Sequence, residues 1–143
     1  MGSGNMYLSR PMDNFALGGS WSGGCLYMSD GLFTNHENAS LDIFADPRID
    51  IIDNGGVGGN LFVNDGLITV WTGEFVIGVP GINNGTIVVI PPDTLIFSAG
   101  WTYMPGSSLE GPGGVAFMGG MHSFPTGSFT ITGPVALITG TLV

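Results

Sequence analysis

The sequence contains no lysine and only two arginines, whereas it carries eleven aspartate and glutamate residues, so its formal net charge at pH 7 is −9. Proteins that bind nucleic acids need cationic side chains to displace the counterions of the phosphate backbone. An anionic membrane surface repels an acidic chain for the same electrostatic reason. The composition therefore predicts a protein that binds neither nucleic acid nor membrane.

Charged residues of either sign are also scarce. They make up 9% of the chain, against roughly 25% in ordinary soluble domains. So few charges leave little to solvate the surface of an isolated domain of 143 residues. The shortage favours a chain whose surface is partly covered, either by copies of itself or by other proteins of an assembly.

Residues for several kinds of specialised site are missing. Cys25 is the only cysteine, so an internal disulfide is excluded. His36 and His122 are the only histidines, and neither has further ligands at the spacing of a zinc site. Residues 19–23 resemble a nucleophile elbow, but tryptophan occupies the central position. We therefore expect no enzyme. Residues 1–19 also lack the basic start and apolar core of a secretory signal.

The chain is rich in short β-branched and aromatic runs separated by turn residues, most clearly in residues 57–104. Asn-Asp-Gly at 64–66, Thr-Gly-Glu at 72–74 and Asn-Asn-Gly at 83–85 are typical of tight hairpin turns. Pro-Pro at 91–92 interrupts strand pairing. The pattern predicts about a dozen short strands and no helix of normal length.

We expect these strands to form an antiparallel β-sandwich or barrel, jelly-roll-like in arrangement, because many short strands punctuated by glycine and proline are typical of such folds. A β-helix or solenoid is the alternative, since its rungs also place apolar residues inward. Residues 1–24 are interpreted as an N-terminal docking arm. Residues 25–143 are expected to form a single all-β domain.

An internal repeat aligns residues 23–34 with residues 58–69 without gaps, and residues 113–123 form a weaker third copy. Each copy is interpreted as a hairpin with a Gly-Gly lead-in and a tight turn. The copies are unevenly spaced along the chain. Uneven spacing favours a sandwich or barrel over a regular solenoid.

Several predicted strands are apolar on both faces. Side chains alternate between the two faces of a strand, yet residues 67–71 and 87–90 place large apolar groups on both. An antiparallel sheet with one solvated face would alternate apolar and polar residues. We therefore expect sister molecules to cover part of the surface, with interface residues Trp71, Ile68, Val70, Ile87, Val89, Trp101, Trp21 and Phe15.

Four aspartates lie close together in residues 41–53, and carboxylate oxygens suit calcium. If the strands on either side of Asp46-Pro47 pair as a hairpin, Asp42 and Asp50 approach each other across it. The spacing lacks the pattern of an EF-hand loop. The alternative reading is that these acids are solvent-facing positions of alternating strands. The candidate Ca²⁺ ligands are Asp42, Asp46, Asp50 and Asp53.

The composition favours a non-enzymatic structural subunit that assembles with itself or decorates a larger assembly, in a virion as a capsid decoration, capsid or tail component. This expectation is an analogy of composition. The alternative is an extracellular or cell-surface module that binds carbohydrate or mediates adhesion. In that module Trp21, Trp71, Trp101, Tyr27 and Tyr103 stack on sugars, whereas the simpler interpretation makes them core or interface anchors.

Overall fold

The computed structural model describes residues 5–143, apart from the side chain of Asp46. These residues form β-strands connected by turns, without a helix, so no helical segment among them could cross a membrane. The all-β prediction is confirmed. The strands are β1 Met6–Leu8, β2 Met12–Asn14, β3 Gly19–Trp21, β4 Leu26–Met28, β5 Leu32–Asn35, β6 Ser40–Asp53, β7 Leu61–Asn64, β8 Leu67–Ile77, β9 Gly81–Asn83, β10 Thr86–Val89, β11 Thr94–Phe97, β12 Trp101–Tyr103, β13 Ser108–Gly111, β14 Gly114–Phe117, β15 Met121–Ser123, β16 Phe129–Ile131, β17 Val135–Leu137 and β18 Thr141–Leu142.

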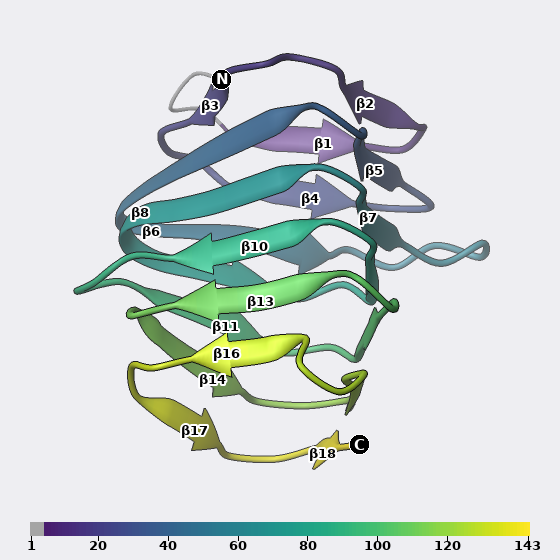
Figure 1. The fold of residues 1–143 in the computed structure, drawn as a ribbon. Helices are drawn as coiled ribbons and strands as arrows, with labels where there is room; N and C mark the ends of the chain where they lie inside the picture. The colour runs from purple at the N-terminus through teal and green to yellow at the C-terminus, as the bar shows by residue number, and fades with distance from the viewer. Residues whose placement is uncertain (1–4) are drawn as a thin grey trace.

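Every strand pair among the described residues is parallel. The chain winds around one axis, and successive coils stack from the N-terminal end to the C-terminal end (Figure 1). The structure is therefore a β-solenoid. The predicted antiparallel sandwich or barrel is wrong, and the alternative β-helix is confirmed.

The solenoid has three faces. Face 1 contains β1, β4, the second halves of β6 and β8, β11, β14 and β17. Face 2 is a separate seven-stranded sheet, with one strand from each coil: β2, β5, β7, β9, β12, β15 and β18. Face 3 contains β3, the first halves of β6 and β8, β10, β13 and β16. The chain thus makes about seven coils.

The expected hairpin turns are corners between faces of one coil. Residues 64–66 connect face 2 to face 3, residues 83–85 do the same one coil later, and Gly73 lies where β8 bends from face 3 to face 1. Gly73 has φ +80°, and a Cβ there would overlap the backbone of Ala45 in the preceding coil. Turn residues specify a change of direction, but whether the next strand reverses or continues depends on contacts between coils.

Coil length explains why the sequence conceals the period. Phe97 pairs with Ile77 and with Phe117, each 20 residues away, but Leu26 pairs with Ile51, 25 residues away. The repeat at 23–34 and 58–69 does not follow this spacing, because Leu26 lies on face 1 and the aligned Leu61 lies on face 2. The repeat is a strand–corner–strand unit that recurs on different faces.

Residues 1–24, as far as they are described, form the first coil. β1 pairs with β4, β2 with β5 and β3 with β6. Leu8 and Trp21 from this segment are buried in the hydrophobic core. The expected docking arm therefore forms strands and continues the same solenoid.

The core lies inside the coils and consists of inward side chains stacked in rows. One row on face 1 contains Leu26, Ile51, Ile77, Phe97 and Phe117, all essentially buried. Aromatic rings continue this stacking across face 2, where the Phe33 and Phe62 rings are 4.7 Å apart. Such rows replace the two-layer core that a sandwich would have.

An asparagine ladder lines the corner between face 2 and face 3. Asn14, Asn35, Asn64 and Asn83 occupy the same position in four successive coils. Each side-chain amide of the first three donates a 2.7 Å hydrogen bond to the Oδ1 of the next asparagine. Asn83 donates instead to the backbone oxygens of its own corner and of the next coil. Tyr103 occupies the next position, so the ladder spans the first four coils.

Candidate interface at the C-terminal end

The candidate calcium ligands are held by different partners. Asp42 lies on face 3, where its Oδ1 accepts a 2.8 Å hydrogen bond from Trp71 Nε1. Asp50 lies on face 1 and makes a 2.7 Å ion pair with Arg48. Asp53 accepts hydrogen bonds at the end of β6. Because β6 is one bent strand, the expected hairpin that would bring Asp42 and Asp50 together is absent.

The side chain of Asp46 lies outside the described part of the chain. Among the described side chains, no group of three histidine, cysteine, aspartate or glutamate residues is arranged to hold a metal ion. The calcium site therefore stays a prediction. A change in melting temperature on adding a chelator would test it.

The two histidines lie in different environments. His36 is partly exposed, its ring stacks on Phe15 with 3.9 Å between centroids, and its Nε2 is 2.8 Å from Asp13 Oδ1. His122 is fully buried beside Phe97 and Phe117. Burial lowers the pKa of His122, although the contact of its Nε2 with Gly119 O opposes that shift. The ring nitrogen contact of His36 is thus to a carboxylate, and that of His122 is to a backbone oxygen.

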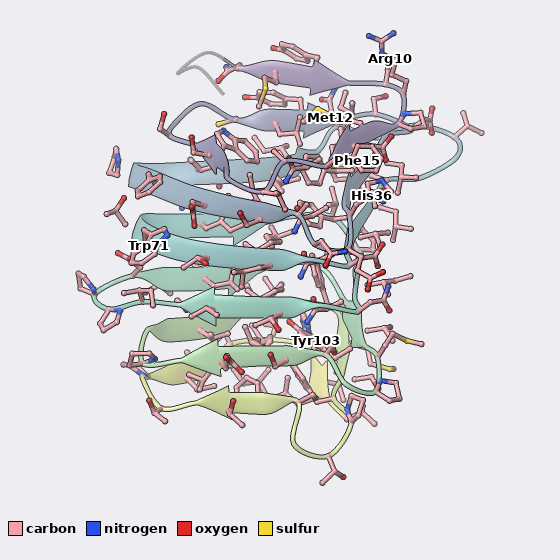
Figure 2. All side chains as sticks on the ribbon, turned by 45° about the horizontal axis from the view of Figure 1, so that its top comes forward. Arg10, Met12, Phe15, His36, Trp71 and Tyr103 are labelled. Carbon is pink, nitrogen blue, oxygen red and sulfur yellow. The ribbon has the colours of Figure 1, made fainter. Side chains whose placement is uncertain are left out.

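The aromatic residues also divide into core and surface. Trp21 and Trp101 are buried inside the coils, whereas Trp71 is 42% exposed and its side chain points away from them (Figure 2). The Phe44 ring lies nearly parallel to the Trp71 indole, with 6.5 Å between centroids. Trp71 is therefore the surface tryptophan of this chain.

The predicted interface residues divide in the same way. Phe15 and Trp71 are exposed. The other six are already covered by the chain's own coils: Ile68, Val70, Ile87, Val89, Trp101 and Trp21. Apolar residues on both faces of a strand therefore reflect an inward row that is fully buried and an outward row that is partly exposed.

Apolar side chains at the C-terminal end lack the cover that the same positions have elsewhere. The C-terminal end consists of the edge strands β16, β17 and β18, each paired on one side only. Leu137 continues the row of Phe117, but it is 52% exposed where Phe117 is fully buried. Val135 is 45% exposed and Leu142 is 40% exposed, whereas their partners one coil earlier are buried. The core is therefore open at this end.

Charged side chains are also missing from the C-terminal end. Glu110 is the last aspartate, glutamate, lysine or arginine in the chain, and residues 111–143 contain none. Exposed edge strands usually carry charged residues that prevent pairing with other chains. Here the unpaired edge, the open core and the absence of charge coincide. Sequence reasoning missed these residues, although the uncharged segment was a readable signal.

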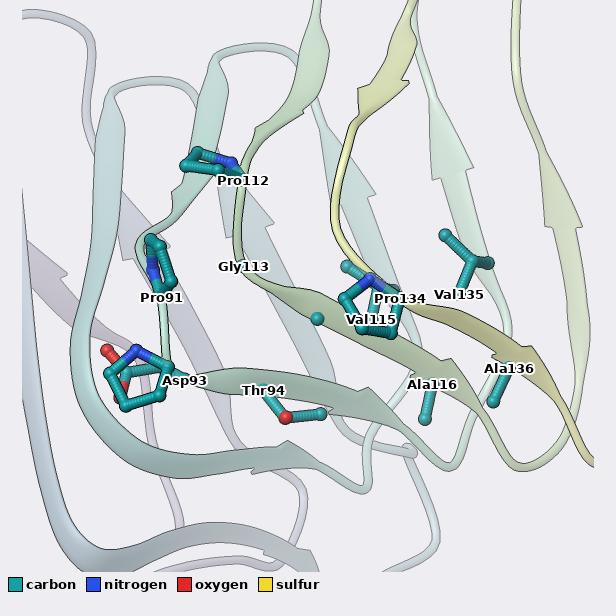
Figure 3. Close-up of a pocket in the computed structure, with 12 residues that line it drawn as sticks. Pro91, Asp93, Thr94, Pro112, Gly113, Val115, Ala116, Pro134, Val135 and Ala136 are labelled. Atoms are coloured by element: carbon teal, nitrogen blue, oxygen red, sulfur yellow. The ribbon is translucent and has the colours of Figure 1, made fainter.

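An apolar groove runs beside this end, at the corner between face 3 and face 1 (Figure 3). Its cavity volume is about 330 Å³, and Pro91, Pro112 and Pro134 line it from successive coils. Asp93 also lines it, but the Asp93 Oδ1 accepts a 2.8 Å hydrogen bond from the backbone N–H of Gly73. Burial raises the pKa of Asp93, and that hydrogen bond partly opposes the shift.

Comparison with protein-family models, with curated proteins and with solved structures finds no match.

Proposed function

We propose that this chain is a non-enzymatic structural subunit that assembles with itself or decorates a larger assembly, a virion being the proposed setting. The observation that carries the proposal is the exposure of Val135, Leu137 and Leu142 on the edge strands β17 and β18, because the partners of these residues in the preceding coil are buried. Apolar surface of this kind, bordered by unpaired strand edges, is typical of a contact between protein chains.

The rest of the solenoid supports a structural role. Stacked coils with continuous core rows and an asparagine ladder form a regular, extended element in which each described strand pair joins neighbouring coils. The virion setting rests on the composition, which is poor in charge and rich in glycine and short apolar strands.

Sedimentation velocity tests the proposal. The purified chain should sediment as an oligomer at micromolar concentration, and Leu137→Glu should shift it toward the monomer because the substitution places a charge on the open core. Val57→Glu is the matched control, since Val57 is an exposed aliphatic residue in the loop that connects β6 on face 1 to β7 on face 2. A chain that stays monomeric across this concentration range would refute self-assembly and leave only the decoration of a larger assembly.

A second candidate function is carbohydrate binding on face 3. Trp71 presents an exposed indole whose Nε1–H donates to Asp42, and Phe44 packs alongside it. Because Trp21 and Trp101 are buried, a glycan on this surface should change the fluorescence of Trp71 selectively. Glycan titration of the unmodified chain and of Trp71→Phe tests this, and an identical response from both would refute it.

A further inference from the structure

The loop that connects β6 to β7 protrudes from the coils (Figure 1). Residues 54–59 are all exposed, and four of them are glycines. The glycines and Val57 take part in none of the described backbone–backbone hydrogen bonds. Instead, the carboxylates of Asp30 and Asp53 accept hydrogen bonds from three of the glycine amides. Side chains therefore hold this loop, whereas backbone bonds between coils hold the corners of the solenoid.

Asn54 begins this loop and is followed by Gly55. Asn54 is exposed, and its side-chain amide has no hydrogen-bond partner among the described residues. Gly55 has φ +77°, and a Cβ there would meet no atom within 4 Å. The side chain of Asn54 is thus free to rotate toward the backbone nitrogen of Gly55, and the space beside that nitrogen is open.

We propose that Asn54 is a site of spontaneous covalent modification, in which the side-chain amide is lost through a cyclic imide. The Gly55 nitrogen forms a bond to Asn54 Cγ and gives up its proton. The Cγ–Nδ2 bond breaks, and Nδ2 leaves with that proton as ammonia. Water then opens the imide at either of its carbonyls. The product is aspartate, or isoaspartate when the chain continues through the side-chain carbonyl.

Two features of Gly55 favour this attack. Glycine has no Cβ to hinder its nitrogen, and its backbone reaches the required rotation easily. The Gly55 N–H also donates a 2.8 Å hydrogen bond to Asp53 Oδ1, so a carboxylate lies within reach of the proton that must leave. Because the nitrogen attacks perpendicular to its peptide plane, this in-plane hydrogen bond leaves the direction of attack open.

The chain contains a second Asn-Gly pair, Asn84-Gly85, whose asparagine is also exposed. There the Gly85 nitrogen donates a 2.9 Å hydrogen bond to the backbone oxygen of Asn64 in the preceding coil. The Asn84 amide is bound to Asp65, and a Cβ on Gly85 would overlap the backbone of the preceding coil. Imide formation would break this link between coils, so we expect it to be roughly 10- to 100-fold slower than at Asn54.

The modification changes the charge of the chain without disturbing the coils. It adds a carboxylate beside Asp53 to a chain whose formal net charge is already −9, and neighbouring like charges repel. Isoaspartate also lengthens the backbone of the loop. Because Asn54 lies outside the core rows and the asparagine ladder, the product should keep the solenoid fold. The reaction marks the age of the chain whether or not the chain assembles.

Peptide mapping by mass spectrometry tests this after incubation of the folded chain in mildly alkaline buffer. Position 54 should accumulate both aspartate and isoaspartate, and roughly 10- to 100-fold faster than position 84. In concentrated urea, where the corner at Asn84 is unfolded, the two positions should react at similar rates. Equal rates in the folded chain, or aspartate without isoaspartate at position 54, would overturn the proposal.

A pair of matched variants tests the part of Gly55. Gly55→Ala should slow the reaction at Asn54 because the methyl group hinders the attacking nitrogen. Gly59→Ala is the control, since Gly59 lies in the same loop with φ +79° and equally open space, so it introduces the same backbone strain away from the reacting atoms. Equal rates at Asn54 in the two variants would overturn attack by the Gly55 nitrogen.

Discussion

Replacing Asn64 with alanine should destabilise the chain strongly, because Asn64 lies in the middle of the asparagine ladder and is fully buried. Its Oδ1 accepts from Asn35 Nδ2, and its Nδ2 donates to Asn83 Oδ1 and to the backbone oxygen of Thr86. Alanine leaves the Asn83 Oδ1 and the Thr86 oxygen without these donors inside the solenoid. Buried polar groups that lose their partners cost roughly 1–3 kcal/mol each.

Asn35 Nδ2 also loses its acceptor, Asn64 Oδ1, but it adds little to the cost because it keeps its hydrogen bond to Leu67 O. We expect the free energy of unfolding to fall by about 2–4 kcal/mol. With a urea dependence of about 2 kcal/mol per molar, the unfolding midpoint should fall by about 1–2 M. Equilibrium urea unfolding at several protein concentrations measures this loss and separates it from any effect of association.

Asn84, the residue after the last asparagine of the ladder, provides the control. Asn84 lies one position after the ladder, where its amide donates a 2.6 Å hydrogen bond to Asp65 at the surface. Asn84→Ala should change the free energy of unfolding by less than about 0.5 kcal/mol. If Asn64→Ala were as mild as Asn84→Ala, the ladder would not stabilise the solenoid, and the reasoning would be refuted.

Three further substitutions test other parts of the structure. Burial raises the pKa of Asp93 above 3.8, so the contribution of its carboxyl group to stability is complete below pH 3.8 and is lost as the pH rises through the folded-state pKa. Asp93→Asn should remove that loss when the free energy of unfolding is measured from pH 3.5 to 7. A pH dependence equal to that of the parent chain would contradict this. Burial lowers the pKa of His122 below 6.5, so the contribution of the neutral ring to stability is complete above pH 6.5 and is lost as the pH falls through the folded-state pKa. His122→Phe should make the melting temperature less dependent on pH between pH 7 and 5. A dependence equal to that of the parent chain would argue against this. A Cβ at Gly81 would overlap the Trp101 ring, so Gly81→Ala should lower the free energy of unfolding in urea by about 1–3 kcal/mol. Gly18 has open space around it, so Gly18→Ala should change that free energy very little. Equal effects of the two substitutions would refute the packing argument.

The sequence predicted strands and turns well but not how they connect. Residues 64–66 and 83–85 do change the direction of the chain between strands, as expected. Tight turns of this composition can begin a hairpin or form a solenoid corner, and the local residues do not distinguish these outcomes. The distinction depends on stacking between coils, such as Asn64 on Asn83, which are 19 residues apart. A row of asparagines at intervals of 21, 29 and 19 residues has no fixed period to recognise.

The candidate interface was only partly accessible from sequence. The shortage of charge predicted that part of the surface is covered, and the uncharged segment after Glu110 locates an apolar end. Inward and outward positions could not be assigned without the fold, so the buried Ile68 and Val70 were placed in the interface. Leu137 was missed because its exposure depends on its place on the edge strand β17, which only the fold defines.

The asparagine ladder ends at Asn83, so the coils before and after Asn83 should differ in local stability. The first four coils carry side-chain bonds that link each coil to the next at the corner between face 2 and face 3. The later coils depend on ring packing, including Phe97 on Phe117. In native-state hydrogen exchange, amides should therefore open progressively from the C-terminus inward. Any partner that binds the edge strands β17 and β18 should therefore slow this local opening and raise the protection of the less stable coils.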